Sequence, residues 1–109
     1  MSGDIKESDW KHFRKLHAIA LNRHCEQTLA EVQALANDRK QTPHERYRAV
    51  YQLLRNRDRE VARAFNDLRR STAVGQIAII VSYGLLTEEE LAGFSPELRS
   101  TLEMLSGLY

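Results

Sequence analysis

The sequence predicts an all-α fold, in which a long antiparallel helical hairpin and short carboxy-terminal helices make one helical bundle. Three observations predict it. Apolar residues recur at helical spacing through residues 8–38 and 42–70, and the few prolines and glycines lie near the expected joints. The single segment that could be a strand, 72–84, has no second apolar segment to pair with. We expect the 109 residues to form a single domain, whose bundle is closed either within the chain or by dimerisation.

The first expected helix, 8–38, has one apolar face that two ionisable side chains interrupt. His17 and His24 are the interruptions, and such groups are excluded from a helix seam unless they find partners. The whole seam consists of Trp10, Phe13, His17, Leu21, His24, Thr28, Val32 and Leu35. A short polar connection, 39–41, follows, and a connection of that length makes the next helix antiparallel to the first.

The second expected helix, 42–70, begins with the clearest local signal in the chain. Thr42 stands before Pro43, and Glu45 follows three residues after Thr42, which is the pattern of a capping box. One carboxylate, Asp58, interrupts the apolar seam of this helix. The seam consists of Tyr47, Val50, Tyr51, Leu54, Asp58, Val61, Phe65 and Leu68.

The apolar segment 72–84 suits either a buried strand or a helix, and we expect a helix because no partner strand exists. Its helical phase continues that of the second helix, so one very long helix is an alternative. Ser71, Thr72 and Gly75 favour a break or a kink instead. Two short helices, 87–93 and 95–106, are expected to complete the chain.

A helix that is apolar on nearly all sides must be covered. A dense apolar block is formed here by Ile77, Ile79, Ile80, Val81, Tyr83, Leu85 and Leu86. Either the carboxy-terminal segment or another chain would cover these side chains. Because the tail is short, we expect the block to be an interface between chains.

The charge balance excludes a strong global field. Sixteen Lys and Arg against 15 Asp and Glu leave a net charge of +1, so nothing draws the whole chain to nucleic acid or to a membrane. The most apolar run, 73–86, is shorter than a bilayer requires. The single cysteine, Cys25, excludes an intramolecular disulfide, and the amino terminus has no signal-peptide apolar region. We therefore expect a soluble, cytoplasmic protein.

An antiparallel hairpin aligns residues at a nearly constant index sum, because both helices rise about 1.5 Å per residue. The expected register puts His17 beside Phe65 and His24 beside Asp58. The candidate buried polar site is therefore His17, His24 and Asp58. The facing pair is either a hydrogen-bonded pair that fixes helix register, or a site in which Asp58 orients His24 as a base or metal ligand. A third alternative is that one of the two faces solvent. No cofactor or metal is expected, because no metal-ligand spacing is present.

Residues 46–70 hold eight arginines. Five of them fall within about a quarter of the helical wheel, and this basic stripe consists of Arg48, Arg55, Arg59, Arg63 and Arg70. The stripe is either a phosphate-binding surface or a solvated face that acidic residues such as Glu26, Glu31 and Glu60 neutralise. We favour the solvated face, because the whole chain is nearly neutral.

These observations do not name an activity, and no catalytic signature is present. We expect a non-catalytic protein–protein interaction or regulatory module, which acts as a homodimer or with another protein. Two alternatives stay open. One is nucleic-acid binding through the arginine stripe, and the other is a ligand- or metal-binding bundle centred on His17, His24 and Asp58.

Overall fold

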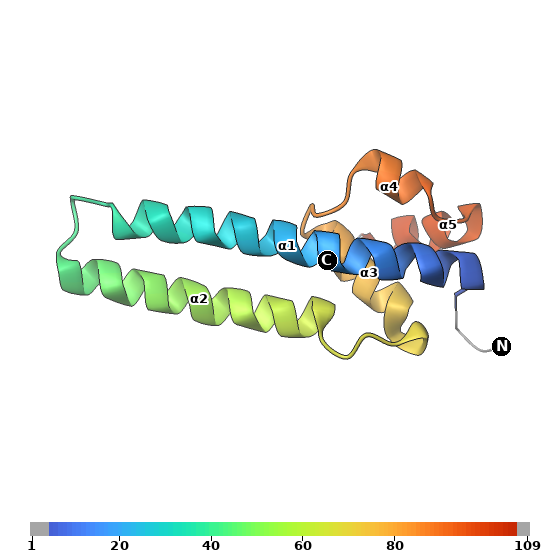
Figure 1. Ribbon diagram of the computed structural model, residues 1–109, viewed down its shortest axis with the longest axis horizontal. Helices are drawn as coiled ribbons and strands as arrows, with labels where there is room; N and C mark the ends of the chain where they lie inside the picture. Colours follow the sequence, from blue (N-terminus) through green and yellow to red (C-terminus); the bar gives the residue numbers. More distant parts are fainter. Residues whose placement is uncertain (1–4, 107–109) are drawn as a thin grey trace.

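The computed structural model describes residues 5–106, and within this range every regular element is a helix. The elements are α1 (Glu7–Ala36), α2 (Pro43–Phe65), the 3-10 turn η1 (Arg70–Thr72), α3 (Ala73–Ser82), α4 (Glu88–Ala92) and α5 (Pro96–Ser106). Figure 1 shows α1 and α2 as an antiparallel hairpin, with the shorter helices gathered at one end of it. The expected all-α class, with a long hairpin followed by short helices, is confirmed.

The molecule is elongated, with extents of 55 × 25 × 24 Å. Helices α3, α4 and α5 pack at the end of the hairpin where α1 begins and α2 ends (Figure 1). At the opposite end, which we call the distal hairpin (residues 29–54), the structure describes only parts of α1 and α2 and their connection. Residues 42–45 start the second helix as expected, because Thr42 and Glu45 form a complete capping box.

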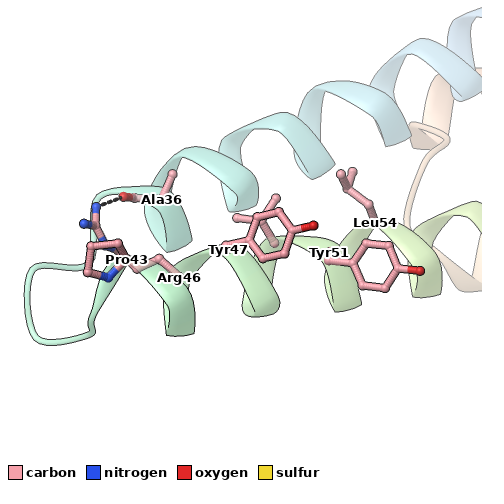
Figure 2. A pocket seen from close by; sticks show the side chains of 7 residues that line it. Ala36, Pro43, Arg46, Tyr47, Tyr51 and Leu54 are labelled. Carbon is pink, nitrogen blue, oxygen red and sulfur yellow. Dashed lines mark hydrogen bonds between the residues drawn. The ribbon is translucent and has the colours of Figure 1, made fainter.

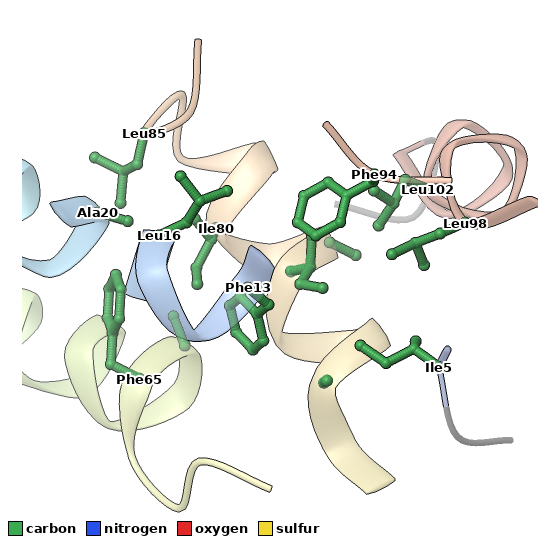
Figure 3. Packing of buried hydrophobic residues seen from close by; sticks show 14 residues of the cluster. Ile5, Phe13, Leu16, Ala20, Phe65, Ile80, Leu85, Phe94, Leu98 and Leu102 are labelled. Carbon is green, nitrogen blue, oxygen red and sulfur yellow. The ribbon is translucent and has the colours of Figure 1, made fainter. Parts of the chain in front are cut away.

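The hydrophobic core lies at the other end, which we call the body and which consists of α3, α4, α5 and the parts of α1 and α2 that pack on them (Figure 3). Its main members are Phe13, Leu16, Ala20, Phe65, Ile77, Ile80, Leu85, Phe94, Leu98 and Leu102. Burial of each leucine, isoleucine or phenylalanine contributes about 1.5–3 kcal/mol relative to exposure. In this core α3 packs against α1 and α5. The short carboxy-terminal segment therefore does cover the apolar helix.

Helix α2 ends at Phe65 and not at residue 70. Side chains from two other helices donate hydrogen bonds to the carbonyl oxygens of Phe65 and of the next residue, Asn66. His17 of α1 donates from Nε2 to the Phe65 carbonyl oxygen at 2.9 Å. Gln76 of α3 donates from Nε2 to the Asn66 carbonyl oxygen at 2.7 Å. In a continuing helix, backbone amides four residues later would occupy these two acceptors.

The chain then turns at Asp67, whose φ of 61° lies in the left-handed region. Helix α3 is accordingly a separate element and does not continue α2. The break falls before the position that Ser71 and Gly75 indicate, and Gly75 lies inside α3. Local sequence signals place this break wrongly because the contacts that end α2 come from distant residues.

Two buried or partly buried contacts hold the carboxy-terminal helices on α1. Asp9, which is buried, accepts from the Ser95 backbone N–H at 2.7 Å and from the Ser95 hydroxyl at 2.6 Å. The Ser95 hydroxyl in turn accepts from the Leu98 N–H at 3.2 Å, at the start of α5. Arg23 donates to both carboxylate oxygens of Glu90, at 2.6 and 3.0 Å.

Replacing Asp9 by alanine should destabilise the protein by about 3 kcal/mol, because two partly buried donors of Ser95 lose a charged acceptor that is itself buried. Urea unfolding followed by circular dichroism measures this change. Glu26→Ala is the matched control, since Glu26 is an exposed acidic residue of the same helix, and its effect should stay within about 0.5 kcal/mol. Equal effects of the two substitutions would show that Asp9 does not hold α5 in place.

The Arg23–Glu90 pair should make stability depend on acid pH. The hydrogen bonds that Arg23 donates to Glu90 lower the pKa of Glu90 from 4.5 to about 2 in the folded protein. A lowered folded-state pKa gives stability that is complete above pH 4.5 and is lost as the pH falls toward 2. The stability difference between the wild type and Glu90→Gln should therefore shrink over this window, whereas Glu89→Gln, on the exposed face of α4, should show no such trend.

Candidate functional site

His24 is buried at the junction of three elements. Only 5 % of the residue is exposed. Its ring stacks on Tyr83 with a centroid distance of 5.6 Å and an interplanar angle of 19°, and it lies 6.3 Å from the ring of Phe65. The nearest carboxylate oxygen is Oε1 of Glu60, which lies 3.4 Å from Nε2. That approach lacks hydrogen-bond geometry, so Nε2 is a buried nitrogen without a hydrogen-bond partner.

The predicted pairing of His24 with Asp58 is wrong, because Asp58 is exposed and Glu60 occupies the position opposite the imidazole. The register itself is close to the expected one, since His17 does meet Phe65. The error lies in the rotation of α2. Residues 58 and 60 stand at nearly the same height but about 200° apart around the helix. At the height of His24 the predicted seam therefore points away from α1, whereas Phe65, near the end of the seam, still packs against α1.

Three charged side chains join the two long helices beside His24. Arg57 donates to Glu31 of α1 at 3.1 Å and to Glu60 at 2.8 Å. The hydrogen bond to Glu31 is the main reason that the pKa of Arg57 is raised above its ordinary value. The two carboxylates therefore share one guanidinium, which compensates half of their formal charge.

A cavity of about 240 Å³ opens on this network. Its lining residues are His24, Gln27, Thr28, Glu31, Arg57, Glu60 and Tyr83. The buried hydroxyl group of Tyr83 makes no hydrogen bond there. Within residues 5–106, no group of three or more His, Cys, Asp or Glu side chains is arranged to hold a metal ion. The network is polar and partly unsatisfied, and its charges hold α1 to α2.

His17 has a different environment from His24. The Phe65 carbonyl oxygen can only accept, so the Nε2 of His17 that lies 2.9 Å away carries the hydrogen. The ring also packs edge-on against Phe13 and Phe65. His17 is thereby engaged in ending α2, and the structure does not bring it together with His24 and Asp58 as one site.

The apolar block of 77–86 is not a free surface. Ile77, Ile80 and Leu85 are fully buried in the core of their own chain, so the predicted interface is wrong for these three residues. The other four, Ile79, Val81, Tyr83 and Leu86, are partly buried and pack against the same core. The apolar block packs within its own chain, because α1 and α5 cover α3.

The arginine stripe is shorter than predicted. Arg48, Arg55, Arg59 and Arg63 are exposed on α2, and the guanidinium of Arg55 lies over the ring of Tyr51 at 5.8 Å. Arg70 is not part of the stripe, because it lies in η1 and donates to the Ile5 carbonyl oxygen and to Glu7.

Several large apolar side chains are exposed on the distal hairpin. Tyr47 is 69 % exposed, Tyr51 53 % and Leu54 46 %, and Leu29 of α1 is 56 % exposed. These α2 side chains border a hollow of about 440 Å³, which we call the hairpin groove and which is lined by Ala36, Pro43, Arg46, Tyr47, Val50, Tyr51 and Leu54. Figure 2 shows the rings of Tyr47 and Tyr51 projecting from the same side of α2.

Sequence reasoning missed this groove although it identified its residues. Tyr47, Tyr51 and Leu54 share the predicted apolar seam of α2, but an apolar seam shows only which side chains point the same way. Helix α1 packs on a neighbouring face, where Arg57 and Ala64 lie. At the tip, Arg46 donates to the Ala36 carbonyl oxygen at 2.7 Å and closes the end of the groove.

The chain was compared with protein-family models, with curated proteins and with solved structures, and none of these comparisons finds a match. Across residues 5–106, none of the helices combines the length and the apolar character needed to cross a membrane.

Substitutions at His24 and Asp58 should differ sharply in their effect on stability. His24→Ala removes a buried ring from its contacts with Phe65 and Tyr83 and should cost about 2–3 kcal/mol. Asp58→Ala changes an exposed side chain and should alter the free energy of unfolding by less than about 0.5 kcal/mol. Urea unfolding of both variants gives the comparison, and a large loss for Asp58→Ala would contradict this placement.

Proposed function

We propose that this protein is a non-catalytic protein–protein interaction module whose binding surface is the hairpin groove. The observation that supports this proposal is the exposure of Tyr47, Tyr51 and Leu54 on a part of the hairpin that no other element of the described residues covers. Contiguous apolar surface of this kind is typical of sites that bind another protein. The groove is also accessible, because the distal hairpin extends beyond the body (Figure 1).

The composition of the groove suits a protein partner. Tyrosine is enriched at protein interfaces because it has a large apolar ring and a hydroxyl that can meet water or a partner. Burial of a side chain such as Leu54 on association is worth about 1.5–3 kcal/mol before the costs of binding are counted. Three such side chains in consecutive turns make a compact centre for an interface.

Nucleic-acid binding through the basic stripe is the less supported alternative. Its four exposed arginines lie on one side of α2, but Arg55 already contacts the Tyr51 ring at the edge of the groove. The net charge of +1 provides little long-range attraction for a polyanion. The polar network at His24 supports a ligand site less well, because Arg57 already binds both Glu31 and Glu60.

Site-specific crosslinking in cells that produce the protein tests the proposed function. A photoreactive phenylalanine analogue in place of Tyr51 should give a discrete covalent adduct, because this position would lie inside the interface. The same analogue in place of Lys11, an exposed residue of the body, is the control and should give none. Tyr47→Glu, combined with the analogue at 51, should remove the adduct by placing a charge in the groove.

Mass spectrometry of the adduct then identifies what occupies the groove. An adduct with this chain or with one other protein supports the proposed function. Equal crosslinking from positions 51 and 11, or none from position 51, would contradict it.

A further inference from the structure

The exposed strip along α2 carries opposite charges at its two ends. Tyr47, Tyr51, Leu54 and Asp58 follow one another at intervals of four, three and four residues, so they share one edge of the helix. Arg48 lies next to the first of them. Arg48 and Asp58 are both exposed, and neither takes part in an ion pair within the described residues.

We propose that the occupant of the hairpin groove is a second copy of this chain, docked with its α2 antiparallel to the first. In this arrangement Arg48 of each copy lies opposite Asp58 of the other copy. The inference rests on the proposed function and adds the identity of the partner and its orientation. Charge complementarity supports it, because in an antiparallel pair the positive end of each strip lies beside the negative end of the other.

The same alignment matches the apolar side chains. Facing residues of antiparallel helices keep a nearly constant index sum. Setting Arg48 against Asp58 of the other copy therefore also sets Tyr51 against Leu54 of the other copy. The two-fold axis passes near residue 53, and each contact occurs twice, as an isologous interface requires. Two tyrosines and two leucines then fill the centre, and the ion pairs lie at the rim.

Helix α1 adds apolar surface to the same interface. Leu29 and Ala36 are seven residues apart, which is about two helical turns, so they point the same way. Ala36 lines the groove, and Leu29 is 56 % exposed. The cross-hairpin contact of His24 with Glu60 sets the register, which puts Leu29 near the height of Leu54. Leu29 therefore lies close to the two-fold axis, opposite its own counterpart.

The body does not cover this strip. Phe65 lies eleven residues after Leu54, on nearly the same face of α2, and it is buried in the core. Tyr47, Tyr51 and Leu54 are exposed, so the body packs on α2 only beyond the strip. A second hairpin can therefore lie along the distal hairpin and complete a four-helix arrangement, in which each pair of helices covers the other.

Sedimentation equilibrium of the full chain from about 1 to 500 µM, a range that covers typical transient and stable dimers, tests the pairing by charge reversal. The wild type should show a concentration-dependent dimer. Arg48→Glu and Asp58→Arg should each raise the dimer Kd by about tenfold or more, because like charges then meet twice. The double variant should bring the Kd back to within about threefold of the wild type, since the ion pairs are re-formed in reverse.

Arg63→Glu is the matched control, because it makes the same change of charge on the same helix, at an exposed position about 120° from Tyr51. Its Kd should stay within about twofold of the wild-type value. Circular dichroism of each variant checks that the helical fold is retained, as expected for substitutions at exposed positions.

A wild type that stays monomeric over the whole range overturns the second-copy proposal. A dimer that is indifferent to both single reversals, or that the double variant does not restore, overturns the antiparallel pairing. These failures are distinct from failure of the proposed function: a monomer that crosslinks from position 51 to a different protein keeps the groove as a binding surface but excludes the second copy.

Discussion

The fold depends on where α2 stops. His17 and Gln76 bind the carbonyl groups of Phe65 and Asn66, and these two hydrogen bonds replace the backbone bonds that would extend the helix. The chain is therefore free to turn at Asp67 and to bring α3 back against α1. Without this turn, the most apolar segment would extend α2 into solvent, and the core of the body would lack its central helix.

Because α3 returns at that point, all the burial is concentrated at one end of the molecule. The body uses α5 and the start of α1 to cover α3, and buried Asp9 holds the start of α5. Among residues 5–106, no further element is left to cover the other end. The distal hairpin therefore keeps two tyrosines and two leucines in solvent, and the same packing that closes the core creates the hairpin groove.

The polar contacts between α1 and α2 set the rotation of α2 about its own axis. Arg57 reaches Glu31 across the hairpin and also binds Glu60, which lies beside His24. These contacts turn the charged face of α2 toward α1, so its tyrosine-rich edge turns outward. In this orientation the guanidinium of Arg57 gains a charged partner on each helix, whereas an exposed tyrosine keeps its hydroxyl group in water. This difference favours the observed rotation.

The sequence by itself determined the helical class, the antiparallel hairpin and the start of α2 at Thr42, because helical periodicity, capping and a short connection are local properties. It also placed His24 in the apolar seam of the first helix, and Tyr47, Tyr51 and Leu54 on one face of the second. Only the tertiary structure decided that Glu60 and not Asp58 faces His24, that α2 ends at Phe65, and which apolar face is left uncovered. Each of these depends on contacts between residues far apart in the chain, and periodicity shows which side chains point together but not what they point at.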